Sequence, residues 1–245
     1  MMKTWRFRIG TLFLAVAFLS VTVHADPVVQ MTVGPMMGAT NMNLMGGVDN
    51  GDNSYDFDGT TSMMGMWSLE YDMTVDQDPF VNANFTFQNM SGMTQSFILN
   101  VTLPITPTVV PSSLIGGSTG GSFNDANNNG IASVGTVGMG SPMYSGEIDG
   151  VGVLPIYPDP TSFSATFAGE TVTIPAVNQG LPGPTIPGPA AYSSIGITHK
   201  FTLTPGDTVA FTSFFVVEPI PEPSSIAMIG LVSGGIFFIR RKFIQ

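Results

Sequence analysis

The chain has 245 residues, no cysteine and a formal net charge of −10 at pH 7, with 17 acidic residues against seven Lys and Arg. The absence of cysteine excludes disulfides, thiolate metal sites and a cysteine nucleophile. Six of the seven bases flank apolar segments at the two ends. Nucleic acid is therefore excluded as a partner, because binding a phosphate backbone requires clustered Lys and Arg.

The N-terminus predicts a secretory signal peptide over residues 1–25. A short basic stretch precedes an apolar run and then small residues, and we expect cleavage between Ala25 and Asp26. An uncleaved anchor is the alternative, but the run is short and contains Ser and Thr. Cleavage leaves His199 as the one histidine of the mature chain, which excludes triads and zinc sites that need a second imidazole.

The clearest periodicity lies between residues 67 and 105. Apolar and polar residues alternate over residues 67–75, 81–88 and 97–105. Such alternation is typical of strands that bury one face. Three strands of this kind in succession predict an antiparallel meander or one sheet of a sandwich.

Further strands are predicted in the second half of the chain. A turn at residues 204–207 predicts a hairpin between the last two of them. Eight or so strands, with no helical periodicity between the termini, predict an all-β fold. We expect an antiparallel β-sandwich of jelly-roll or immunoglobulin-like type over residues 26–218. The five later strands are expected at residues 147–154, 161–168, 171–177, 194–203 and 207–217.

Three segments break the pattern and predict loops: residues 34–66, 116–130 and 181–191. They are rich in Gly, Asn, Asp, Met or Pro. The 16 methionines are interpreted as adaptable core packing, because thioether copper sites need tightly spaced methionines.

One loop contains a calcium-like pattern. Asp125, Asn127 and Asn129 stand at alternate positions before a glycine, as in the first half of a calcium loop. The second half is missing, because Thr136 stands where a bidentate Glu is expected. A bound ion would need carboxylates from elsewhere, and the acidic stretch at residues 49–58 is one source. The alternative is that these side chains form Asx turns with their own backbone.

No spacing of carboxylates singles out a catalytic pair of the kind that a glycosidase uses. We therefore expect no enzymatic activity.

The C-terminal region predicts a membrane segment over residues 225–239, followed by Arg240, Arg241 and Lys242. The segment is short for a hydrocarbon core of about 30 Å and spans it only marginally. Basic residues resist translocation, so this cluster should stay cytoplasmic while the rest is exported. A buried C-terminal core helix is the alternative, which the terminal bases disfavour.

The tail, residues 219–245, resembles a known sorting signal. Pro221, Glu222, Pro223 and Ser224, then the apolar run, then the basic cluster are similar to the PEP-CTERM signal of Gram-negative bacteria. The resemblance implies a single-pass inner-membrane precursor whose tail is removed by an exosortase, a membrane-embedded cysteine protease. The same tail is also labelled an ice-binding protein C-terminal domain, a label that describes the signal and implies no contact with ice.

These features predict an exported, non-enzymatic structural protein of the cell surface or extracellular matrix. Signal peptidase and exosortase are its processing partners, and exopolysaccharide is a candidate partner. The alternative is a carbohydrate-binding module, with calcium as its one candidate cofactor. A glycan-binding face would expose coplanar aromatics, whereas the structural role expects Trp67, Tyr71, Phe85 and Phe211 to be buried.

Overall fold

The computed structural model describes residues 26–220. The predicted signal peptide with Ala25, and the predicted membrane segment at residues 225–239, lie outside this part of the chain. Residues 26–220 form sixteen β-strands, and no helix among them is long and apolar enough to cross a bilayer.

The first sheet contains eight strands. Its main order is β11-β10-β15-β7-β1-β2, and β9 pairs with β15 and β12. All its pairs are antiparallel. The strands are β1 (Val29–Pro35), β2 (Thr40–Leu44), β7 (Gln95–Pro104), β9 (Ser133–Gly135), β10 (Tyr144–Ile148), β11 (Val151–Ile156), β12 (Ser162–Ser164) and β15 (Ser194–Leu203).

The second sheet also contains eight antiparallel strands. Its main order is β13-β8-β16-β6-β5-β4-β3, and β14 pairs with β8. The strands are β3 (Val48–Asp49), β4 (Ser54–Met63), β5 (Trp67–Asp76), β6 (Phe80–Asn89), β8 (Ser113–Asn124), β13 (Thr171–Gln179), β14 (Ile186–Gly188) and β16 (Thr208–Pro219).

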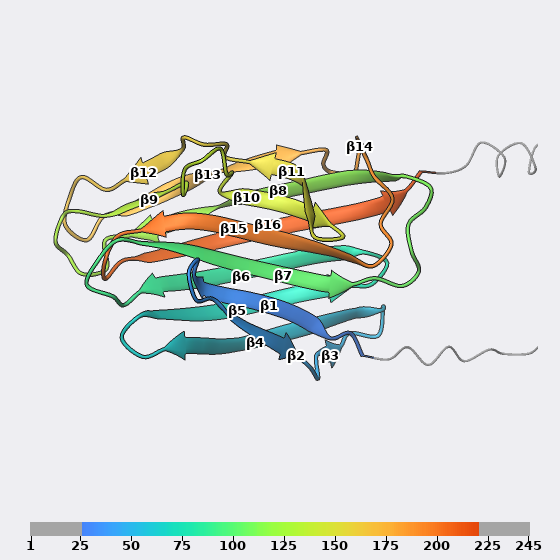
Figure 1. Cartoon of the computed structure of the whole chain (residues 1–245), viewed down its shortest axis with the longest axis horizontal. Coiled ribbons are helices and arrows are strands. Elements are labelled where there is room, and N and C mark those ends of the chain that lie inside the picture. Colours follow the sequence, from blue (N-terminus) through green and yellow to red (C-terminus); the bar gives the residue numbers. More distant parts are fainter. Residues whose placement is uncertain (1–25, 221–245) are drawn as a thin grey trace, which may run out of the picture.

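The two sheets enclose one hydrophobic core. Along β6 and β7 the apolar residues of the alternating pattern are buried and the intervening residues are at least partly exposed. In the middle of the core, Phe87 of the second sheet contacts Phe97 and Phe201 of the first at ring-centroid distances of 4.5 and 5.4 Å. The strands run along the long axis of the molecule (Figure 1). The predicted all-β, two-sheet architecture is therefore confirmed.

The sandwich has more strands than expected. Its described part has eight strands in each sheet, whereas immunoglobulin-like domains have seven to nine in total and jelly rolls have eight. The three alternating segments at residues 67–105 are strands, but they do not form one meander. β5 and β6 pair in the second sheet, and β7 lies in the first.

Two of the predicted loops are largely strands. Residues 34–66 contain β2, β3 and the ten-residue β4, which buries Tyr55 and Phe57. Of the predicted loop at residues 116–130, residues 116–124 lie in β8, which pairs with β16 on one side and with β13 on the other. Residues 181–191 are mostly a loop, as predicted, and contain one short strand, β14.

The predicted hairpin at residues 204–207 is wrong. The turn is present, but β15 belongs to the first sheet and β16 to the second. The chain therefore crosses between the layers here, and this crossing brings the turn beside the loop that follows β8.

Candidate functional site

The described chain begins and stops at the same end of the sandwich, which we call the terminal end (Figure 1). β16 lies between β8 and β6 in the second sheet and ends at Pro219. Its last residues are held by pairing with Ser113 and by a 3.1 Å hydrogen bond from the Val217 amide to the Pro79 carbonyl. One residue, Ile220, separates this strand from Pro221.

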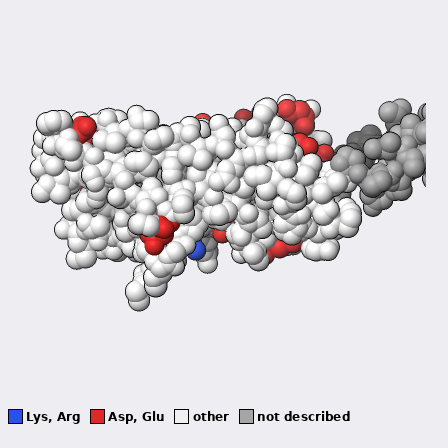
Figure 2. Space-filling view, turned by 90° about the horizontal axis from the view of Figure 1, so that it is seen from above, with Lys and Arg blue, Asp and Glu red and all other residues white. Residues whose placement is uncertain are grey.

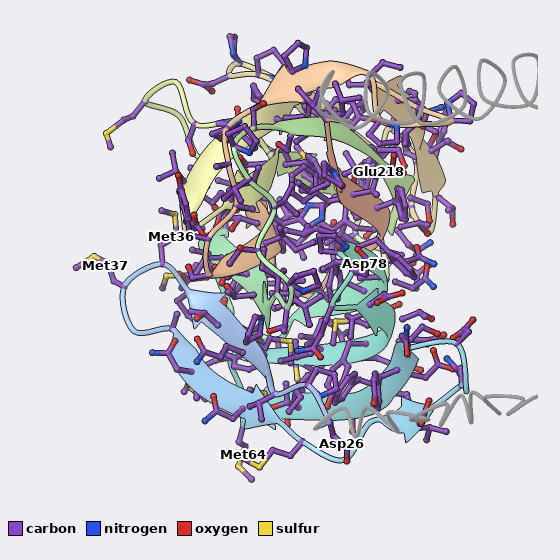
Figure 3. The ribbon with its side chains drawn as sticks, turned by 90° about the vertical axis from the view of Figure 1, so that its right-hand side faces the viewer. Asp26, Met36, Met37, Met64, Asp78 and Glu218 are labelled. Carbon is purple, nitrogen blue, oxygen red and sulfur yellow. The ribbon has the colours of Figure 1, made fainter. Side chains whose placement is uncertain are left out.

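The terminal end is acidic. Figure 3 looks onto this end and labels Asp26, Asp78 and Glu218. Asp49 ends β3 at this end, and Asp52 lies in the connection from β3 to β4. Figure 2 shows a mostly uncharged surface on which acidic atoms gather near the point where the described chain stops. A surface of this sign repels anionic lipid head groups, which favours a domain that stands off the bilayer.

The opposite end carries exposed methionines. Met37 and Met64 are almost fully exposed, and they come from the β1–β2 and β4–β5 connections. The prediction that the methionines pack in the core therefore fails for many of them, although Met31, Met73 and Met143 are buried. Figure 3 shows Met36 and Met37 on one side of the sandwich and Met64 on another, so these three thioethers do not converge on one point.

The calcium-like loop lies at this same far end, directly after β8. Asp125 is fully buried, and its carboxylate accepts hydrogen bonds from the amides of Gly130 at 2.7 Å, Gly169 at 3.0 Å and Asn129 at 3.2 Å. These backbone hydrogen bonds lower the pKa of Asp125, although burial acts in the opposite direction.

The two asparagines of the loop form Asx turns. Asn127 Oδ1 accepts from the Asn129 amide at 3.0 Å, and Asn129 Oδ1 accepts from the Ile131 amide at 2.7 Å. The Asn127 side-chain amide also donates to the Pro205 carbonyl at 2.6 Å, which joins the loop to the turn before β16. Each asparagine oxygen therefore already accepts one backbone hydrogen bond.

The second predicted source of calcium ligands is in the wrong place. Strand pairing puts Asp49 beside Tyr55 at the terminal end, whereas Asp125 follows the far end of β8. A ten-residue strand spans about 33 Å, so the acidic stretch at residues 49–58 and the calcium-like loop cannot share an ion. Residues 26–220 also contain no group of three or more His, Asp or Glu side chains placed to hold a metal.

Sequence reasoning missed Asp207, which lies in the turn between β15 and β16. Its side chain is fully buried, and neither carboxylate oxygen has a hydrogen-bond partner. Burial raises the pKa of Asp207, and the charge of Asp125 raises it further. The predicted hairpin implied that Asp207 is exposed, because an aspartate in a hairpin turn normally faces solvent.

The single histidine of residues 26–220 lies inside the core. His199 Nε2 and Ser213 Oγ are 2.9 Å apart, and Ser213 Oγ is 2.9 Å from Thr119 Oγ1. The imidazole also stacks on Phe211 at 4.4 Å. Burial lowers the pKa of His199 to about 3. Because His199 and Ser213 are both buried, the pair joins the two sheets and is closed to substrate in this conformation.

The outer faces of the sheets carry two polar hollows. One, of about 340 Å³ on the first sheet, is lined by Glu147, Thr198 and Lys200 among others. The other, of about 590 Å³ on the second sheet, is lined mainly by Ser, Thr, Gln and Glu side chains. Neither lining includes an aromatic residue.

The aromatic residues named from the sequence are mostly internal. Trp67, Phe85 and Phe211 are buried, as the structural role expects, and Tyr71 is half-buried. Among residues 26–220, the strongly exposed aromatics Phe167 and Tyr192 lie near opposite ends of the sandwich. They cannot form a shared platform for a sugar.

Comparison with known proteins bears on the tail alone. A family model described as the PEP-CTERM protein-sorting motif matches residues 219–242. No curated protein matches the chain. A motif of this type implies export, and processing by an exosortase while the protein is anchored at the membrane. The match begins at Pro219, the last residue of β16, so the folded sandwich and the signal are contiguous. The C-terminal region of this exported chain is a PEP-CTERM protein-sorting motif.

Proposed function

We propose that this protein is a non-enzymatic structural component of the cell surface or extracellular matrix, released there after its sorting signal is processed. The observation that carries the proposal is the direct passage of β16 into the motif. The sandwich is thereby the cargo of the signal, with one residue between the strand and Pro221. The polar outer faces and the fully packed core suit a stable building block of a hydrated matrix.

The order of events follows from the termini. Signal peptidase would cut between Ala25 and Asp26, and the tail would then hold the sandwich by its terminal end. The acidic residues at that end would face the lipid, and the methionine-bearing end would point away from it. Exosortase would act close to the folded domain, and cleavage near Pro221, Glu222 and Pro223 would free it.

Alanine replacement of Pro221, Glu222 and Pro223 should stop processing. The altered precursor should accumulate in the membrane fraction of the native host with its tail intact, and mass spectrometry would read its C-terminus. Glu218→Ala is the matched control, because this acid lies at the end of β16 and just outside the matched residues. Its processing should remain normal.

The structural role has its own test. Fractionation of the native host should place the processed protein with the surface or matrix material, and deletion of its gene should weaken the cohesion of that material. An uncut chain recovered among soluble cytoplasmic proteins would contradict the proposal.

A second candidate function is carbohydrate binding, which the polar hollow around Glu147, Thr198 and Lys200 favours. Asn100 extends this polar surface, because its amide donates to Glu147 at 3.1 Å and to Thr198 at 2.6 Å. Matrix polysaccharide should then bind the protein, and Lys200→Ala should raise the Kd of this binding. Equal retention of wild type and variant on the polysaccharide would argue against this candidate.

A further inference from the structure

Asp207 has a buried carboxylate that no hydrogen bond or opposite charge within residues 26–220 compensates. Its carboxylate is fully buried, and the nearest donors are the Thr204 hydroxyl and the backbone amides of Ala126 and Asn127. These donors act to lower the pKa of Asp207, but none of them meets the carboxylate in hydrogen-bond geometry. A buried carboxylate without a partner costs several kcal/mol if it is ionised, so a counter-charge or a proton is expected at this position.

The surroundings increase the cost. The Asn127 side chain, in the loop that begins at Asp125, donates to the Pro205 carbonyl in the turn that contains Asp207, so the two acidic groups lie in adjoining segments. In addition to burial, the charge of Asp125 raises the pKa of Asp207. Lys200, the one strong base of residues 26–220, lines the polar hollow on the outer face of the first sheet, and Asp207 has no side-chain partner. Either the two carboxyls share a proton, or a cation lies between them.

The free lone pairs favour a cation. Two carboxylates offer about eight acceptor positions, and the amides of Asn129, Gly130 and Gly169 use three of those on Asp125. Neither oxygen of Asp207 uses any. Beside the two carboxylates, the neighbouring polar groups are the Thr204 hydroxyl and backbone amides, so the carboxylate and hydroxyl oxygens are the donor atoms available to a cation. Such oxygen donors suit a hard divalent cation, and an irregular loop suits calcium better than the strict octahedron of magnesium.

We propose that Asp207 and Asp125 bind one calcium ion between the turn before β16 and the loop after β8, with loop oxygens and water completing the shell. The ligand set extends that expected from the sequence, because Asp207 supplies the missing carboxylate; the Asn127 and Asn129 oxygens each already accept one backbone hydrogen bond. The site lies at the end opposite the sorting motif and does not depend on the proposed function.

Thermal melting tests the proposal on the protein purified from its host. Calcium at a hundredfold excess over its Kd should raise Tm by about 5–10 °C relative to chelator. Asp207→Asn keeps the size of the side chain but removes its charge, so it should abolish this calcium response. In chelator the variant should melt above the wild type, because the repulsion between Asp207 and Asp125 is gone.

Asp149→Asn is the matched control. Asp149 is also held by backbone amides, those of Tyr192, Ser193 and Ser194, but at the terminal end. This variant should keep the full calcium response. Calorimetric titration of the wild type with calcium, and separately with magnesium, measures binding without relying on any variant.

The outcomes separate the two explanations. A wild type whose Tm and titration heat are unchanged by calcium overturns the proposal. A calcium response that survives in Asp207→Asn also overturns the assignment. Loss of the response in Asp207→Asn and its retention in Asp149→Asn support it.

Discussion

At pH 4 the protein should be about 3 kcal/mol less stable to unfolding, through His199 alone, than it is at pH 7. The pKa of this imidazole is about 3 in the folded protein against 6.5 when it is free, because burial disfavours the charged ring. The unfolded chain therefore takes up a proton as the pH falls below 6.5, whereas the folded chain stays neutral until about pH 3. Stability is lost across this window and is fully present above pH 6.5.

The substitution that isolates this effect is His199→Gln. Glutamine is polar, does not titrate, and has a side-chain amide to donate to Ser213, so the contact between the sheets has a replacement. Denaturant unfolding at pH 7, 5.5 and 4 should show a smaller acid loss in the variant, by about 3 kcal/mol at pH 4. Its stability at pH 7 should be lower than that of the wild type, because the stacking on Phe211 is lost.

The carboxyl groups of Asp149 and Asp207 change the stability of the protein in a different pH range or in the opposite direction. The pKa of Asp149 is lowered to about 2 by hydrogen bonds from the amides of Tyr192, Ser193 and Ser194, against the effect of burial, so its stabilisation is lost largely below pH 4. The raised pKa of Asp207 has the opposite sign, because a group that prefers its proton in the folded state stabilises the protein as the pH falls. Equal acid losses in wild type and His199→Gln would show that the imidazole is not the cause.

Alternation identified the strands whose two faces differ. It correctly placed the buried residues of β5, β6 and β7, because one side of each strand faces the core and the other faces water. It could not assign these strands to sheets. The turns after β6 and β15 have the composition of ordinary hairpin turns, yet each crosses between the layers. Crossing depends on long-range packing that local composition does not encode.

The calcium-like loop shows the same limit. The local pattern located Asp125, but Asp207, the second ligand that we propose, lies 82 positions later, and its turn reaches this loop only through the crossing between β15 and β16. The sorting motif, in contrast, was recognised completely, because its three parts are contiguous in the chain and are read in order. Short-range signals were therefore predictable, and sites assembled from distant segments were not.

β8 is the longest strand that the composition of the sequence predicted to be largely a loop. Its sequence is rich in Gly, Ser and Thr, which normally indicates a loop. The glycines serve close packing instead. At Gly117 an added Cβ would lie 2.7 Å from a methyl carbon of Leu154 in the opposite sheet and 3.0 Å from the Phe214 carbonyl oxygen. Side chains of the first sheet thus reach the backbone of β8, and glycine is needed in the interior of this strand.

Gly121→Ala should have the largest effect among the glycines of β8, lowering the free energy of unfolding by about 3 kcal/mol or more. An added Cβ would overlap the carbonyl oxygen of Ala210 in β16, and the backbone φ of +155° is one that side chains rarely adopt. The overlap is with backbone, so no rotamer change relieves it. Relief would require β8 and β16 to separate, which would break the pairing of two neighbouring strands in the second sheet.

Gly92→Ala is the control for this substitution. Gly92 lies in the connection between β6 and β7, where an added Cβ meets no atom within 4 Å, so its unfolding free energy should change by about 0.5 kcal/mol or less. Denaturant unfolding of both variants measures the difference, and circular dichroism checks that the strands persist. A Gly121→Ala protein as stable as Gly92→Ala would mean that β8 does not pair with β16 in this register. The direct connection from the sheet to the sorting motif would then lose its support as well, because β8 pairs with β16 up to Pro219, where the matched residues begin.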